Sequence, residues 1–250
     1  MGSDRITTPA DRFALRESVA RERGVDWQDV VSARRRSPTG LEGTVEEVVE
    51  SITAAGGRAV AVHCDVTDEN QVANLVEQTL AHYRRIDVLC NNAGVMSMGE
   101  TMDDIDPERW DEIMRINTRG PYLCCRAVLP TRVAQRGGSI VNIGSRAGVS
   151  AGIGGGVAYS ASKAALHMFT FCLADEVKEH NIAVNVLSPG AVKSEGSAAI
   201  PWTRGDWHQR VEPEEVTPSA VFLALQDAAS FTGQLASRDE FGRTWGIGHD

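Results

Sequence analysis

The chain has 250 residues, of which 42% are hydrophobic and 24% charged, and its formal net charge is −9. This composition is ordinary for a soluble globular protein and argues against disordered, collagen-like and membrane classes, while the negative charge disfavours nucleic acid or an anionic membrane as the main partner. An apolar run of the roughly 18 residues that span a bilayer is missing, as is a signal-peptide hydrophobic region, so we expect one cytoplasmic domain over residues 1–250.

Residues 1–38 contain two glycines, Gly2 and Gly24, and show no apolar β-type run ahead of a glycine cluster. Residues 11–23 are compatible with a helix, and "DVVSARRR" (29–36) could form a strand. The next segment, "TGLEG" (39–43), is followed by Glu46 and Glu47, whose charges together with Glu42 would repel phosphates. We therefore interpret it as a turn and helix start rather than a phosphate-binding loop.

From residue 57 onward, four short apolar runs alternate with longer helical patterns. The runs cover residues 58–66, 85–94, 137–145 and 181–190, and each ends in small or polar residues. Buried parallel strands end in this way before a loop at their carboxyl edge. The sequence therefore predicts four parallel strands.

Three helical patterns lie between these runs. In the first, Thr67 is the expected N-cap, and Val72, Leu75, Val76 and Leu80 mark one apolar face. The second begins near Asp106-Pro107, and the third covers about 158–179. Alternating strands and helices favour an α/β fold with a doubly wound, Rossmann-like parallel sheet in three α/β/α layers, with a ligand crevice at the carboxyl ends of the strands. Residues 193–217 lack a clear period and are interpreted as a long loop or substrate lid.

The five cysteines and six histidines do not show the spacing of a metal site. The cysteines are odd in number, have no C-x-x-C spacing and mostly lie in apolar runs, so we interpret them as buried residues in a reducing compartment. The histidines lack H-E-x-x-H or a similar motif. No metal is predicted.

Tyr159 and Lys163 are spaced as i and i+4 in the third helical pattern, which places a phenol and an ammonium on one helix face. An adjacent positive charge stabilises a phenolate and lowers the pKa of the tyrosine, so that it can exchange a proton with an alcohol or carbonyl near neutral pH. Taken alone, the same spacing also fits a surface lysine beside a half-buried tyrosine.

Other polar residues follow the predicted strands at characteristic places. Asn91-Asn92-Ala93-Gly94 ends one strand, Ser145 ends the next, Asn117 lies inside a helix, and Pro189-Gly190 ends a later strand. With Tyr-x-x-x-Lys at 159–163, this order and spacing resembles the short-chain dehydrogenase/reductase family in its single-domain form, over about residues 45–235.

The resemblance implies a role for each matching residue. Tyr159 would be the catalytic acid/base, and Lys163 would lower its pKa and hold the nicotinamide ribose. Ser145 would hydrogen-bond the substrate oxygen, and Asn117 would anchor a water in the proton relay. The residues add a local reason, because Pro121 has no N–H to donate to the carbonyl of Asn117, which leaves that carbonyl free for a water. A solvated helix residue is the alternative interpretation of Asn117.

The resemblance also implies an NAD(P)(H) cofactor and the residues that contact it. The dinucleotide-binding positions beyond Tyr159 and Lys163 are Asp65, Val66, Asn91, Asn92, Ala93, Gly94, Pro189, Gly190, Val192 and Ser194. Ser194 stands where the family has threonine, and both supply a hydroxyl. Arginines at 34–36 resemble the pattern that pairs with a 2′-phosphate, which gives a slight lean to NADP.

The family's T-G-x-x-x-G-x-G motif, in which glycines let the backbone approach the pyrophosphate, is absent from the front of the chain. The chain has only three lysines against many arginines, as a GC-rich gene would give. Our hypothesis is that the family-type N-terminus has been replaced, by a frameshift in the gene or its prediction or by real divergence. The alternative is that residues 11–23 form the expected helix with an altered sequence.

The sequence thus predicts an NAD(P)-dependent oxidoreductase that interconverts a secondary alcohol and a ketone, with a small-molecule substrate. The alternative is a non-catalytic or cofactor-binding-impaired homologue, either a pseudoenzyme or a gene-model artefact. A serine hydrolase is disfavoured because "IGSRAG" around Ser145 is not G-x-S-x-G. The helices over 122–130 and 164–177 are apolar on more than one face, and since family members pair these helices between subunits, a homotetramer or homodimer is expected.

Overall fold

The computed structural model describes residues 44–96, 101–103, 105–151, 156–198 and 206–248. The interpretations of residues 1–43, including the helix at 11–23 and the strand at 29–36, lie outside these residues. The chain divides into two compact units, one of residues 1–42 with 191–213 and the other of residues 43–190 with 214–250. The single-domain organisation stays a prediction.

The second unit contains a four-stranded sheet in which every pairing is parallel. Its strands are β1 (Val88–Asn91), β2 (Gly138–Ile143), β3 (Ile182–Ser188) and β4 (Leu235–Ser237), in the order β1-β2-β3-β4. Every residue of β3 is buried, as expected for a central strand covered on both faces. Three of the four predicted strands are therefore confirmed, and β4 supplies a short final strand.

The predicted strand at 58–66 is wrong, because residues 57–65 form no strand. The run has the composition of a strand, but a strand also requires a hydrogen-bonded neighbour. β1 pairs with β2, and none of the described strands lies on its other side. Without a partner, the apolar run at 58–66 is irregular chain that ends in a turn at 66–67.

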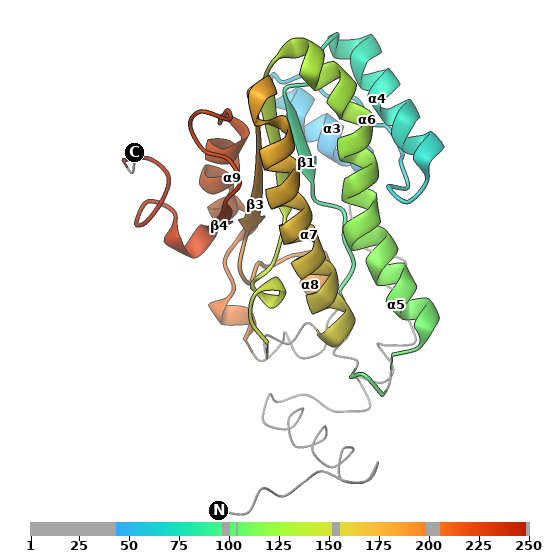
Figure 1. Ribbon diagram of the computed structural model, residues 1–250, viewed down its shortest axis with the longest axis vertical. Coiled ribbons are helices and arrows are strands. Elements are labelled where there is room, and N and C mark those ends of the chain that lie inside the picture. The colour runs from blue at the N-terminus through green and yellow to red at the C-terminus, as the bar shows by residue number, and fades with distance from the viewer. Residues whose placement is uncertain (1–43, 97–100, 104, 152–155, 199–205, 249–250) are drawn as a thin grey trace, which may run out of the picture. The chain divides into compact units, whose positions relative to one another are not determined.

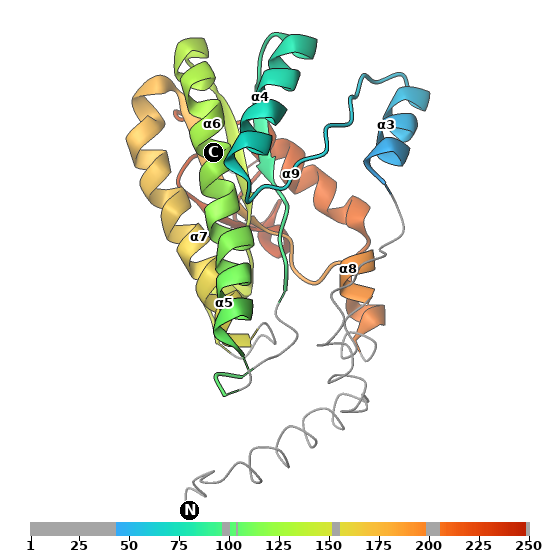
Figure 2. The ribbon, with the colours of Figure 1, turned by 90° about the vertical axis from the view of Figure 1, so that its right-hand side faces the viewer.

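Helices cover both faces of this sheet. α6 (Gly120–Gln135) and α7 (Gly156–Val177) pack on one face, with α4 (Glu69–Tyr83) beside α6, and α9 (Thr217–Ala224) packs on the other (Figures 1 and 2). Along β2, Ile140 joins the core under α6 and α7, whereas Val141 joins Leu223 of α9 on the opposite face. This alternation confirms the three-layer, doubly wound α/β fold.

The remaining elements are short. α3 (Val45–Ala54) begins with a capping box between Thr44 and Glu47, so a helix start does follow the 39–43 segment. Single turns occur at η2 (Arg146–Gly148), η3 (Lys178–His180), η5 (Trp207–Gln209), η6 (Pro213–Val216) and η7 (Arg238–Glu240), and α8 (Glu195–Ala198) has one turn. The described parts of the predicted loop at 193–217 thus consist of short helical turns joined by irregular chain, and its lid role stays a prediction.

The second predicted helix is confirmed and contains an irregular turn. Asp106 caps α5 (Pro107–Met114), whose helical path continues through a π-helical turn, η1 (Arg115–Arg119), into α6. The Gly120 N–H donates to the Arg115 carbonyl, five residues back. Because Pro121 cannot donate the usual bond to Asn117, the wider turn is a physical response to the proline.

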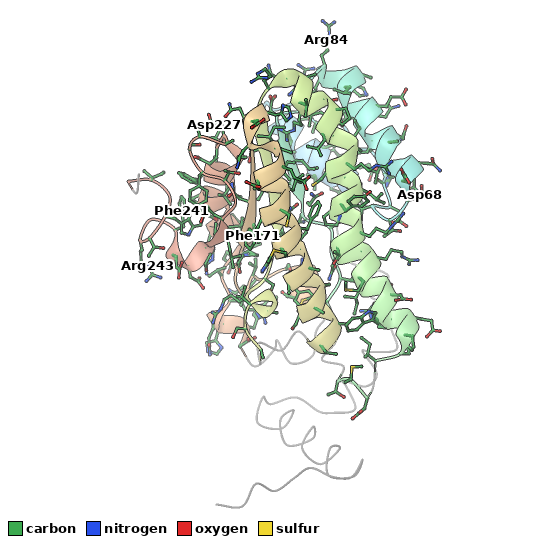
Figure 3. The ribbon with its side chains drawn as sticks, in the orientation of Figure 1. Asp68, Arg84, Phe171, Asp227, Phe241 and Arg243 are labelled. Carbon is green, nitrogen blue, oxygen red and sulfur yellow. The ribbon has the colours of Figure 1, made fainter. Side chains whose placement is uncertain are left out.

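The N-cap of α4 is Asp68, not Thr67 as predicted. The Asp68 carboxylate accepts from the backbone N–H groups of Asn70 and Gln71, at 2.9 and 3.2 Å. Figure 3 shows Asp68 at one end of this helix and Arg84, its C-cap with a φ of 66°, at the other. Thr67 lies one residue too early to cap α4, and its backbone N–H donates to Asp65 Oδ1 instead.

This cap can be tested by replacing each candidate with alanine. Asp68→Ala is expected to lower Tm by about 2 to 4 °C, because two amide hydrogens of the first turn lose their acceptor. Thr67→Ala is the matched control and is expected to shift Tm by less. Thermal unfolding followed by circular dichroism measures both variants, and a larger shift for Thr67→Ala would contradict the assignment of Asp68.

The cysteines differ from the prediction that they are buried. All five are free thiols, and Cys124 and Cys125 are buried in α6, but Cys90 and Cys172 are exposed. Cys90 lies on β1, whose far side has no described strand, and Cys172 lies on the outer face of α7. None of the helices in the described part of the chain is both long and apolar enough to cross a bilayer.

Candidate active site

Most of the residues implicated by the sequence lie at one edge of the sheet. Because β1, β2 and β3 are parallel, their carboxyl ends share this edge. Asn91 ends β1, Ser145 follows β2 by two residues, and Pro189 follows β3. The fold therefore brings together residues that are almost a hundred positions apart in the chain.

Tyr159 and Lys163 lie one turn apart near the start of α7. Lys163 is 6% exposed, and its Nζ lies 5.7 Å from the centroid of the Tyr159 ring and donates to the Ile143 carbonyl at 2.8 Å. This carbonyl is the last of β2, so the bond fixes the ammonium at the carboxyl edge. Burial lowers the pKa of Lys163 to about 8, because desolvation disfavours the charged form.

The pKa of Tyr159 is raised, whereas the sequence predicted that it would be lowered. Burial is the main cause, and a hydrogen bond with the Ser145 side chain acts in the opposite direction. The difference arises because burial disfavours the charged phenolate, and Lys163 donates its hydrogen bond to a backbone carbonyl rather than to the phenol oxygen. Tyr159 and Ser145 are nevertheless brought together as the spacing suggested.

Asn117 is 1% exposed and its side chain joins two other elements. Its Oδ1 accepts from the Val95 N–H, and its Nδ2 donates to the Val95 carbonyl, both at 2.8 Å. Nδ2 also donates to Ser162 Oγ at 3.0 Å, and that hydroxyl donates to the Tyr159 carbonyl at 2.8 Å. Asn117 is therefore a buried link between the segment after β1 and the start of α7, not a solvated helix residue. The free carbonyl at this residue stays a prediction.

Ser145 begins a tight turn after β2. Its Oγ accepts from the Ala147 N–H at 3.2 Å, and its carbonyl accepts from the Gly148 N–H at 3.0 Å. Its own N–H donates to Nε2 of His167, a residue of α7, at 3.3 Å. His167 lies one turn beyond Lys163, so Tyr159, Lys163 and His167 form one stripe on the buried face of the helix.

His167 is held neutral by its surroundings. Burial, followed by the positive charge of Lys163, lowers the pKa of His167 to about 4. Between pH 4 and about 6.5 the unfolded chain binds a proton that the folded chain does not, so stability is expected to fall as pH drops through this window. Urea unfolding at several pH values measures the slope. In His167→Leu the slope should be shallower, and an unchanged slope would show that another group titrates.

The predicted cofactor residues of the β1 edge divide into buried and exposed positions. Asn91 is buried and donates from Nδ2 to Asn142 Oδ1 at 2.8 Å, so its side chain points into the protein. Asn92, Ala93 and Gly94 are exposed. At Gly94 an added Cβ would lie 3.2 Å from Asn117 Oδ1 and 3.7 Å from Lys163 Nζ, so the glycine keeps this approach open.

Asp65 and Val66 precede α4, as predicted for a loop that contacts the adenine. Asp65 is exposed, and hydrogen bonds from the backbone and side chain of Thr67 lower the pKa of its carboxyl group. Val66 packs partly into the core against Leu123 and Cys124. A charged acceptor at the surface and an apolar side chain beside it are compatible with an adenosine, and their role stays a prediction.

Pro189 and Gly190 end the segment after β3. The Pro189 carbonyl accepts from Arg238 Nε at 3.0 Å, and Gly190 has a φ of 80°, which favours glycine. Val192 and Ser194 belong to the other compact unit. There, Val192 pairs with Val211, and Ser194 exchanges hydrogen bonds with Ser197. These contacts neither place the two residues at the edge nor remove them from it.

The residues at this edge fit the ribose and nicotinamide half of a dinucleotide. The buried Lys163 ammonium has three N–H donors, and Ile143 is the one acceptor that the described residues supply. Ser188 Oγ, at the end of β3, is buried and has no partner in the described part of the chain. The N–H donors of Lys163 and the hydroxyl of Ser188 lie at the same edge as the exposed segment 92–94. They suit the ribose hydroxyls and the nicotinamide amide of a dinucleotide. The glycine motif that the sequence lacks would contact the pyrophosphate. The residues where it is expected, 1–38, lie outside those that the structure describes.

Two residues of the site were missed at the sequence level, Ser162 and His167. Ser162 lies between Tyr159 and Lys163 in the motif, and His167 is spaced i+4 from Lys163. Helical periodicity could have placed both on the buried stripe of α7. Their partners, Asn117 and the Ser145 N–H, could not be found in this way, because they come from other elements.

A parallel, doubly wound sheet with a Tyr-Lys-Ser cluster at its carboxyl edge defines an α/β protein of the dinucleotide-binding class. The family model described as short chain dehydrogenase matches residues 35–204. The chain belongs to this family. The match begins at residue 35, near the end of the front segment (1–38) in which the glycine motif was not found.

Known proteins agree with this assignment. The chain is 35% identical over 200 residues to a protein named "Probable tetrahydroxynaphthalene reductase" from Zymoseptoria tritici, covering 77% of this chain and 74% of that one. It is 36% identical over 198 residues to a cyclopentanol dehydrogenase from Comamonas sp., covering 74% and 76%. A solved metagenomic short-chain oxidoreductase in complex with NADP has a TM-score of 0.64 and 32% identity, covering 77% and 80%.

Proposed function

We propose that this chain is an NAD(P)-dependent oxidoreductase that interconverts a secondary alcohol and a ketone. The observation that carries the proposal is the cluster of Tyr159, Ser145 and Lys163 at the carboxyl edge, with a phenol and a serine hydroxyl in contact and a buried ammonium beside them. Relatives named as a reductase and as a dehydrogenase of a secondary alcohol support the same chemistry.

Each residue of the cluster has a part in moving the proton. In the direction of reduction, the Tyr159 hydroxyl donates its proton to the carbonyl oxygen of the substrate, and in oxidation the phenolate accepts it. Ser145 Oγ donates a hydrogen bond to the same substrate oxygen and holds it beside the phenol. The nicotinamide, when bound, supplies the hydride for reduction or accepts it in oxidation.

Lys163 supports this transfer in two ways. Its remaining N–H donors hold the ribose hydroxyls of the cofactor, and its positive charge favours the phenolate over the neutral phenol. Asn117 keeps Val95 and the start of α7 together and contributes its backbone carbonyl to a water-mediated proton path. Asp65, Val66 and residues 91–94 would contact the adenosine half, and the nicotinamide half would be contacted by Pro189, Gly190, Val192 and Ser194.

NADP is the favoured dinucleotide. The arginines at 34–36 would pair with its 2′-phosphate, and a structural neighbour contains NADP. The proposed setting is the cytoplasm, and the proposed partners are a small alcohol or ketone and further copies of the chain. Tyr122 on α6 and Met168 on α7 are 44% and 60% exposed, which supports pairing of these helices between copies as a homodimer or homotetramer.

The reaction is tested by following deuteride transfer. The full chain is incubated with 4-deuterated reduced nicotinamide dinucleotide and a panel of cyclic and aromatic ketones, and the alcohols are analysed by mass spectrometry. We expect deuterium on the carbinol carbon of at least one product, in amounts that depend on Tyr159. Ester cleavage in place of label transfer would instead favour hydrolysis.

A further inference from the structure

We infer that His167 is a positioning residue that holds the Ser145 turn in its working geometry through its Nε2 atom. The inference rests on the proposed function, because it concerns how Ser145 is presented to the substrate. His167 lies in α7, 3% exposed, and takes no part in the proton transfer proposed above.

The hydrogen bond fixes the protonation state of the ring. A backbone N–H can only donate, so Nε2 of His167 must be unprotonated to accept from Ser145 at 3.3 Å. The proton of the neutral ring then lies on Nδ1, which is buried and has no partner among the residues that the structure describes. An apolar ring of equal size would fill the space without this unpaired N–H, so the polar role of His167 is at Nε2.

The packing around the ring shows that the turn is built against it. A Cβ added at Gly144 would lie 2.5 Å from His167 Nε2, and one added at Gly148 would lie 2.7 Å from Cε1. The turn between these glycines therefore lies directly on the imidazole, and any side chain at either position would push it away. Ser145 is the residue between them that also contacts Tyr159.

α7 thus carries both the acid/base and the support of its serine partner. Lys163 bonds the Ile143 carbonyl and His167 bonds the Ser145 N–H, so consecutive turns of the helix hold the end of β2 at two points. A displacement of about 1 Å at a reacting group can lower a rate about a hundredfold. His167 therefore acts on the rate through the position of Ser145.

The state of the ring can be tested without turnover. In ¹⁵N-histidine NMR spectra of the full chain, His167 is expected to be the Nδ1–H tautomer at neutral pH. The Ser145 amide hydrogen is expected to exchange slowly in the wild type and faster in His167→Leu, whereas His167→Gln, which offers an amide oxygen near the position of Nε2, should restore protection. A protonated ring, an Nε2–H tautomer or unchanged exchange in His167→Leu would overturn the inference.

A double-mutant cycle tests the effect on rate. His167→Leu is expected to lower kcat about 10- to 100-fold with little change in dinucleotide affinity, and His167→Gln to recover most of the loss. In a Ser145→Ala background, His167→Leu should add less than about a twofold loss, because both changes act on one group. Additive losses would overturn the inference about His167 and leave the proposed function intact. Full turnover by Ser145→Ala would remove Ser145 from the proposed mechanism and the role of His167 with it.

Discussion

Tyr159→Phe is expected to lower kcat about a thousandfold while leaving dinucleotide affinity unchanged. The phenyl ring keeps the volume of the half-buried side chain, and the hydroxyl that exchanges the proton is lost. Steady-state kinetics with the substrate found in the deuteride screen gives kcat, and fluorescence titration gives the affinity.

A matched substitution separates the chemistry from a general effect of losing a tyrosine hydroxyl. Tyr83→Phe removes a phenol hydroxyl from the last residue of α4, which has no part in the proposed site, and should leave kcat unaltered. If Tyr159→Phe turned over as fast as the wild type, Tyr159 could not be the acid/base, and the proposed mechanism would be wrong.

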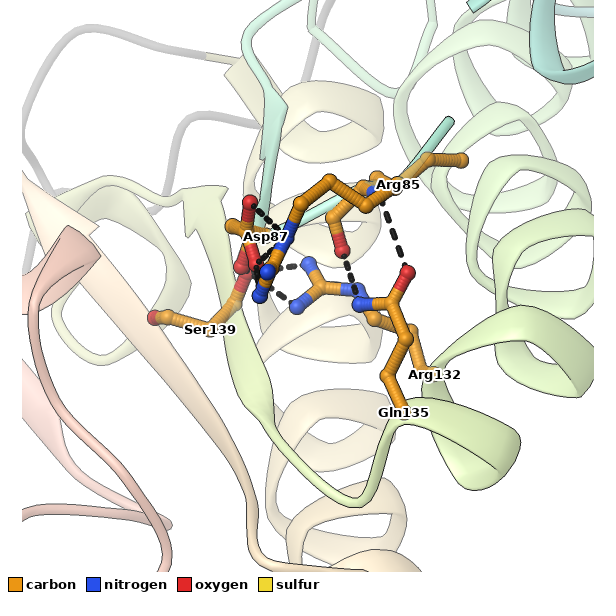
Figure 4. A network of polar contacts seen from close by, with 6 residues as sticks. Arg85, Asp87, Arg132, Gln135 and Ser139 are labelled. Atoms are coloured by element: carbon orange, nitrogen blue, oxygen red, sulfur yellow. Dashed lines mark hydrogen bonds and ion pairs between the residues drawn. The ribbon is translucent and has the colours of Figure 1, made fainter. Parts of the chain in front are cut away.

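Gly138→Ala is expected to destabilise the fold by about 3 to 5 kcal/mol, or about 10 °C in Tm. Gly138 has a φ of 118°, and an added Cβ would lie 1.5 Å from Arg132 Nη1. Arg132 is fully buried and donates from its two terminal nitrogens to the carbonyls of Asp87 and Ser139, as Figure 4 shows. The methyl group would displace this guanidinium and leave a buried charge without its acceptors.

The location of this network makes the expected effect specific to stability. Gln135 exchanges two further hydrogen bonds with the backbone of Ile86, so α6 is tied to the chain that enters β1 and to the start of β2. These are the amino ends of the strands, at the edge opposite Tyr159. Gly138→Ala should therefore unfold at lower temperature with its dinucleotide affinity retained below that temperature.

Gly137 provides the control for this prediction. A Cβ added at Gly137 would lie 3.9 Å from the carbonyl oxygen of Asn181, which is an ordinary contact, and the φ of Gly137 is not in the left-handed region. Gly137→Ala should change Tm by no more than a few degrees. Equal effects of the two substitutions, measured by calorimetry, would contradict the role given to Arg132.

The sheet could be predicted where burial alone determines it. β3 is buried at every residue, and its sequence is apolar except at Asn185 and Ser188, as is typical of a central parallel strand. The run at 58–66 looked similar, yet whether such a run becomes a strand depends on a neighbour elsewhere in the chain. The predicted N-cap of α4 was wrong for a more local reason, because Thr67 and Asp68 are adjacent in the sequence and are both good N-cap residues.

The site was predictable to the extent that its residues belong to motifs. Tyr159 and Lys163 share a helix face by their spacing, and the fold brings Ser145 to Tyr159. The side-chain bonds of Asn117 and the contact of His167 with the Ser145 turn depend on how α7 packs against other elements, which periodicity does not specify. The direction of the Tyr159 pKa shift was missed because a neighbouring charge can be recognised in a sequence, whereas the degree of burial cannot.

The most direct test of the account is a titration of the full chain with NADPH and with NADH, followed by tryptophan fluorescence. We predict saturable binding with a micromolar Kd, tighter for NADPH, and at least tenfold weaker binding by Lys163→Met, which removes the donors to the ribose. Binding that does not saturate for either dinucleotide would contradict the account and support a homologue that keeps the fold of the family without its cofactor.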